Sequence, residues 1–169
     1  MARRRKKAEK NGKPTQLQIA GVFLFFLILR FLLLFFRENM GSRYTDIMTV
    51  FVAFAGLRLK LSGPSLLAWS WLAGISEDMF SGCALGSNAL SKLTVAEALS
   101  ITSRKVEIGN AVVQILLAMV AFALDVLVKY GVAYATLETS LAKQVLASIL
   151  MIKVATGTIL YLITCAIMR

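Results

Sequence analysis

The chain has 169 residues, of which 58% are hydrophobic, and it carries a formal net charge of +10 with no histidine. A soluble domain of this length does not need so much apolar surface, and several apolar runs approach the ~20 residues that span a bilayer. Without histidine the chain lacks the usual general base and the commonest metal ligand, so composition predicts an integral membrane protein and disfavours a metalloenzyme.

Residues 1–16 are predicted to form a basic, disordered cytoplasmic tail, because seven of the first 13 residues are Lys or Arg. Such a segment is attracted to anionic lipid headgroups. Nucleic-acid binding is not expected, because no aromatic residue interleaves these charges. The apolar run at 17–36 is longer than the apolar part of a signal peptide, and no small-residue cleavage site follows it. We therefore expect an uncleaved first membrane span there.

Apolar runs and breakers predict an all-α fold with a single six-helix transmembrane domain over residues 17–169. A break at Ser62, Gly63 and Pro64 separates the second helix from the third. The six expected helices are 17–36, 44–60, 65–81, 85–103, 107–130 and 140–168. This arrangement leaves no soluble domain on either side of the bilayer.

The distribution of Lys and Arg predicts the orientation. With six spans, twelve of these residues fall on the side of the termini and four on the other side, which include Lys129 and Lys143. Cytoplasmic loops carry an excess of Lys and Arg, so both termini are expected in the cytoplasm.

Charged residues inside the spans are expected to pair, because unpaired charges in lipid are costly. The outer half is predicted to hold a buried polar cluster of Arg30, Glu77, Lys92, Asp125 and Lys143. Near the middle of the membrane, Glu97 and Lys153 are predicted to form a pair. The helix at 85–103 has many polar residues, so we expect it to lie centrally or to line a cavity.

No catalytic residue, cofactor or metal is predicted. Asp78 and Asp125 both fall near the outer ends of their helices, so an intramembrane aspartyl hydrolase stays open as an alternative. Ser140 and Lys143 match the S-x-x-K pattern of penicillin-binding enzymes without its companion motifs, which favours a helix cap and an interfacial lysine. Two cysteines, Cys83 and Cys165, do not make a metal site without histidine.

Residues 74–90 carry the most distinctive pattern of the chain. Gly74, Asp78, Gly82 and Gly86 recur every four residues, and a helix places such residues along one side. Small residues at this spacing allow a neighbouring helix to approach closely. We therefore expect this stripe to be a helix-packing surface.

This segment resembles the core of the bacterial rod shape-determining protein MreD family. The resemblance covers Gly74, Asp78, Ser81, Gly82, Gly86, Asn88, Ala89 and Leu90. The length, the six predicted spans, a proline before the third span and an aspartate in the fifth agree in outline. Glu77 departs from the apolar or amide residue usual in the family, and Arg30 and the long basic tail are not typical of it.

The resemblance implies a non-catalytic protein of the bacterial inner membrane that serves cell elongation and peptidoglycan synthesis. Its expected partner is a single-span, coiled-coil protein similar to MreC. The wider assembly would include the actin-like MreB, the glycosyltransferase RodA and a class B penicillin-binding protein. The implied fold is similar to the substrate-binding components of energy-coupling-factor transporters. A vitamin-binding component of such a transporter is therefore the alternative function, and it should enclose a ligand-sized cavity.

Overall fold

The protein is described by a computed structural model that covers residues 14–35, 46–61, 63–81, 86–106, 110–137 and 142–168. Every secondary-structure element in these residues is an α-helix, which confirms the predicted helical class for this part of the chain. The helices are α2 (Gln16–Phe35), α3 (Ile47–Leu57), α4 (Gly63–Ser81), α5 (Ser87–Lys105), α6 (Ala111–Leu137) and α7 (Ala142–Ile167). Each corresponds to one predicted helix. The first 13 residues and the segment 36–45 lie outside the described residues.

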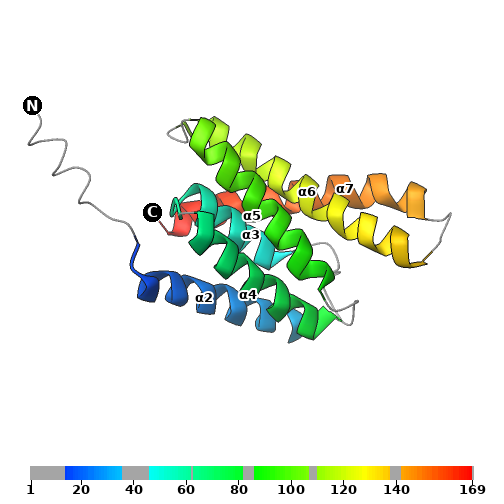
Figure 1. The fold of residues 1–169 in the computed structure, drawn as a ribbon, viewed down its shortest axis with the longest axis horizontal. Coiled ribbons are helices and arrows are strands. Elements are labelled where there is room, and N and C mark those ends of the chain that lie inside the picture. Colours follow the sequence, from blue (N-terminus) through cyan, green and yellow to red (C-terminus); the bar gives the residue numbers. More distant parts are fainter. Residues whose placement is uncertain are drawn as a thin grey trace, which may run out of the picture.

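The helices form one bundle in which successive helices run in opposite directions (Figure 1). The indole N–H of Trp69 donates to the Gln16 side chain at the start of α2 (3.4 Å), and the Phe31 and Phe80 rings meet near the ends of α2 and α4. These contacts show that α2 and α4 run in parallel. The start of α2 and the end of α7 lie at the same end of the bundle (Figure 1). We call the opposite end, where α3 and α5 begin, the distal end.

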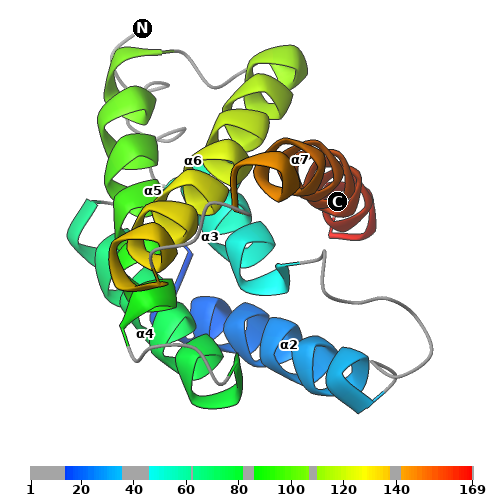
Figure 2. The ribbon, with the colours of Figure 1, turned by 90° about the vertical axis from the view of Figure 1, so that its right-hand side faces the viewer.

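α3 is the central helix, and it packs against α2, α4, α5, α6 and α7 (Figure 2). All 11 of its residues are buried, which fits its almost wholly apolar sequence. Asp46 caps its start by accepting a hydrogen bond from the Thr49 N–H (3.1 Å). At 1.5 Å per residue α3 is only about half as long as the hydrocarbon core is thick. Of the span predicted at 44–60, the structure thus describes a short core helix, Ile47–Leu57, which is shorter than the three candidate spans.

Three helices are long and apolar enough to cross a membrane, over Gln16–Leu33 in α2, Ala111–Val132 in α6 and Leu150–Ile167 in α7. Their outward faces carry large exposed apolar side chains such as Phe25, Val120 and Ile159. Apolar surface of this extent is unusual on a soluble monomer. The coarse prediction of a membrane protein is thus supported by three candidate spans. α4 and α5 have 19 residues each but are more polar.

Gly74 and Gly86, in the segment 74–90, have different structural roles. A Cβ on Gly74 would lie 2.3 Å from the Ala89 Cα, so the backbones of α4 and α5 touch there. Gly86 has open space around it and a φ of +94°, which glycine adopts without strain. α4 ends at Ser81, so Gly86 does not continue a stripe along that helix, and the predicted packing role of Gly86 is wrong. Gly82 lies outside the described residues.

Candidate functional site: a buried ion network and a capped helix

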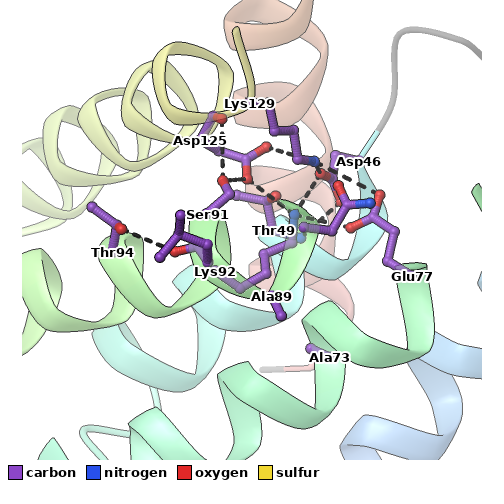
Figure 3. A network of polar contacts seen from close by, with 12 residues as sticks. Asp46, Thr49, Ala73, Glu77, Ala89, Ser91, Lys92, Thr94, Asp125 and Lys129 are labelled. Carbon is purple, nitrogen blue, oxygen red and sulfur yellow. Dashed lines mark hydrogen bonds and ion pairs between the residues drawn. The ribbon is translucent and has the colours of Figure 1, made fainter. Parts of the chain in front are cut away.

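Lys92 on α5 is the centre of a buried ion network near the distal end of the bundle (Figure 3). Its side chain is 0% exposed, and its ammonium group lies among three carboxylates. The Nζ atom is 2.6 Å from Asp46 Oδ2, 3.0 Å from Asp125 Oδ1 and 3.0 Å from Glu77 Oε2. The first two contacts are hydrogen bonds, whereas the third is an ion pair without hydrogen-bond geometry. Lys92 therefore links α3, α4 and α6 to α5.

Two further cations complete the network. Lys129, one turn after Asp125 on α6, pairs with Asp46 and lies 3.1 Å from Asp125 Oδ2 and 3.8 Å from Glu77 Oε1. The Arg30 guanidinium on α2 lies 3.7 Å from the same Glu77 oxygen, Oε1. Three cations thus face three carboxylates, and their formal charges cancel. Buried charges are tolerated when they are paired. Asp46 and Asp125 also accept hydrogen bonds from Lys92, whereas the buried Glu77 Oε2 and Arg30 Nε atoms have ion-pair neighbours but no hydrogen-bond partner.

Ser91 adds a hydroxyl contact to this network. It donates to the Asp125 side chain and lies 3.1 Å from the Asp125 backbone carbonyl. Ser91 is itself 0% exposed, so its hydroxyl helps to hold α5 against α6 rather than facing a solvent-filled site.

The network lies at one depth in the bundle. Arg30 is three residues before the end of the candidate span in α2, and Lys129 is three residues before the end of the candidate span in α6. At 1.5 Å per residue, both Cα atoms lie about 5 Å inside the ends of those spans. Their side chains are 16% and 20% exposed, whereas the other four members are almost wholly buried. The network is therefore sealed inside the bundle and approaches the surface only at Arg30 and Lys129.

Asp78 forms a second polar feature, one that closes the α4–α5 hairpin. Its Oδ2 accepts hydrogen bonds from the N–H groups of Gly86 (2.9 Å) and Ala89 (3.2 Å). Its Oδ1 accepts from the Asn88 N–H (3.0 Å) and the Asn88 side-chain amide (2.9 Å). The first N–H groups of a helix have no partner within the helix, and the positive end of the helix dipole favours an anion. Asp78, which lies on α4, therefore caps the N-terminus of α5.

The structure brings together four of the five residues predicted for the outer cluster, namely Arg30, Glu77, Lys92 and Asp125. The Lys143 side chain lies outside the described residues, as do the Ser81 side chain and Leu85 of the segment at 74–90. The sequence analysis did not predict Asp46, which caps the start of α3, or Lys129, which it assigned to the side of the membrane away from the termini. The i,i+4 spacing of Asp125 and Lys129 was a usable signal, because such residues share a helix face.

The predicted Glu97–Lys153 pair is not present among the ion pairs of the described side chains. Glu97 is exposed on α5, which packs against α3, α4 and α6, and Lys153 is half-buried on α7. Depth matching from sequence places two residues at one level of the membrane. It does not show which helices are neighbours.

The geometry favours structural roles for these polar groups. Asp78 accepts hydrogen bonds from the start of α5, whereas the Asp125 carboxylate contacts Ser91, Lys92 and Lys129, so the two aspartates serve different partners. Within the described part of the chain, no group of three or more Cys, Asp or Glu side chains is arranged to hold a metal ion.

No protein-family model, curated protein or solved structure matches this chain. Fold and site together define a helical bundle with three apolar helices long enough to cross a membrane and a charge-neutral ion network buried near one end.

Proposed function

We propose that this protein is a non-catalytic membrane scaffold of the bacterial cell-elongation machinery, as its resemblance to the MreD family implies. The observation that carries this proposal is the closed α4–α5 hairpin. Gly74, Asp78, Asn88 and Ala89 belong to the family-like motif, and they meet in one place through backbone contact and hydrogen bonds. The motif therefore holds two helices in a fixed arrangement, which is what a binding scaffold requires.

The buried ion network supports the same proposal. Its carboxylates face lysine and arginine side chains of the same chain, and its most central residue has no exposed surface. Charged groups that are paired within the chain hold its helices together and are not offered to a substrate. The outer faces of the helices remain for contact with a single-span, MreC-like protein and, through it, with MreB, RodA and a class B penicillin-binding protein.

The experiment that tests the proposal is purification of the tagged chain from membranes of its native host, followed by mass spectrometry. An MreC-like protein and cell-wall synthesis enzymes are expected. A chain without residues 1–13 should recover the same partner, because the proposed contacts lie in the membrane and the basic tail contributes lipid attraction. Recovery of a pair of ATPases with a bound vitamin would instead establish the transporter alternative. Loss of the partner on truncation would show that the tail is the binding element.

We further propose that both termini face the cytoplasm of the inner membrane and that the distal end faces outward. Arg58 and Lys60 are exposed at the end opposite the ion network, in agreement with the excess of basic residues on cytoplasmic sides. In a background without Cys83 and Cys165, a cysteine at Tyr134 should react with an impermeant thiol reagent added from outside, and a cysteine at Lys60 should not. The reverse labelling pattern would overturn this orientation.

A further inference from the structure

Glu97 is an exposed carboxylate near the centre of α5, a helix that packs against α6, which holds one of the three candidate membrane spans. It is the eleventh of the 19 residues of α5. Ser91 on α5 contacts Asp125 on α6, and the two helices run in opposite directions (Figure 1). Glu97 lies six residues after Ser91 on α5, and Met119 lies six residues before Asp125 on α6. Met119 lies near the middle of the candidate span Ala111–Val132. Placing the candidate span of α6 across a bilayer puts Glu97 near the middle of the hydrocarbon layer, where its short side chain does not reach either surface.

The exposed charge of Glu97 distinguishes α5 from the outward faces of the other helices. Among the described helical side chains, Glu97 is the one charged group in the exposed class, since the others are buried or half-buried. The exposed residues of α4, α6 and α7 are apolar, glycine or proline throughout the described side chains. A carboxyl group facing lipid at mid-depth is costly, and such groups normally face protein. The structure therefore leaves a polar group where a lipid surface would not favour one.

The surroundings of Glu97 have the spacing of a helix–helix seam. Leu90, Thr94, Glu97 and Ile101 are exposed on α5 and follow one another at intervals of four, three and four residues. This is the spacing of the contact positions in a pair of helices that wrap around each other. The other sides of α5 are already covered by α3, α4 and α6. One further helix is thus enough to cover what remains of α5.

We propose that the α5 seam (Leu90, Thr94, Glu97 and Ile101) binds one transmembrane helix of a partner protein, and that this helix presents a hydrogen-bond-donating side chain opposite Glu97. The chemical complementarity selects this occupant over lipid, because a lysine, arginine, amide or hydroxyl group would satisfy the carboxyl group at mid-depth. Interhelical hydrogen bonds and close packing drive association within a bilayer. This inference rests on the proposed function, and it assigns the partner's span to a particular face.

The first test is site-specific photo-crosslinking in native membranes. A benzophenone amino acid is placed at Leu90 or Ile101 on the seam, and at Ile159 on the outer face of α7 as the matched control. All three positions carry exposed large apolar side chains, so insertion should be tolerated equally. Crosslinks to the membrane span of the MreC-like protein are expected from the two seam positions and not from Ile159. Crosslinks that join two copies of this chain, or that arise only from α7, would overturn the proposal.

The second test separates binding from folding. Glu97→Leu removes an exposed polar group, so the purified chain should unfold at the same or a higher temperature than the wild type. Recovery of the co-expressed partner should nevertheless fall about three- to eighteen-fold, as expected for loss of one interhelical hydrogen bond, and Glu97→Gln should lose less because an amide still hydrogen-bonds. A lower unfolding temperature would indicate a structural role within this chain and would refute the proposal.

The two proposals fail in different ways. If the wild-type chain recovers the MreC-like protein but the seam variants change nothing, the scaffold function stands and the seam assignment is wrong. If the wild-type chain does not recover that partner, both proposals are wrong.

Discussion

Lys92→Met is expected to lower the free energy of unfolding by about 3–5 kcal/mol, the usual cost of removing one member of a buried ion pair. Methionine fills a similar volume but supplies no charge. Asp46, Glu77 and Asp125 would then share two cations, Arg30 and Lys129, and the buried network would carry a net negative charge. Thermal unfolding in detergent, followed by size-exclusion chromatography of the soluble fraction, measures the loss.

Lys153→Met is the matched control. Lys153 lies in a candidate span of α7 but has no ion pair among the described side chains, so its replacement should change the stability by no more than about 0.5 kcal/mol. The double variant Lys92→Met/Glu77→Gln restores the balance of charge, with two cations and two carboxylates. It should therefore be more stable than Lys92→Met alone. A double variant as unstable as the single one would show that the contacts of Lys92, rather than neutrality, stabilise the bundle.

The network illustrates what the sequence could and could not predict. Arg30, Glu77, Lys92 and Asp125 were found because a charge within an apolar helix needs a partner. Asp46 fell inside the helix predicted at 44–60 and was not assigned to the cluster, whereas in the structure it caps a helix that begins at Ile47. Lys129 was not predicted to join the cluster, because a long side chain near the end of a span can equally reach water or turn inward. The packing of α3 against α6, which the sequence does not show, brings the Asp46 and Lys129 side chains together.

The helices show the same limit. An apolar run predicts a helix, and each expected helix has a counterpart in the structure. The run at 44–60 does not show whether its helix faces lipid or the other helices, because both surroundings favour apolar side chains. α3 proved to be a short, fully buried core helix. The polar helix at 85–103 was expected to lie centrally or to line a cavity. Instead α3 lies at the centre, and α5 packs against α3, α4 and α6 with one face exposed.

Asp78→Ala is expected to have the second large effect, through the start of α5. Three backbone N–H groups and the Asn88 amide would lose their acceptor at once. A single N-terminal cap contributes about 0.5–2 kcal/mol, and an unsatisfied buried donor costs about 1–3 kcal/mol. The loss should therefore exceed that of an ordinary cap. Asp78→Asn keeps one acceptor oxygen and should be less harmful. Ser76→Ala, on the same helix, is the control, since its hydroxyl bonds only within α4 among the described contacts.

Hydrogen exchange locates the effect of Asp78→Ala. Amide protection should fall first at residues 86–90, where the cap acts, while the central helix α3 keeps its protection. Because the seam on α5 begins at Leu90, fraying of this turn should also reduce recovery of the MreC-like partner. Under the aspartyl hydrolase alternative the order changes. Asn and Ala at Asp78 would then abolish function equally, residues 86–90 would stay protected, and an uncleaved substrate would accumulate. That result would refute both the capping role of Asp78 and the scaffold function.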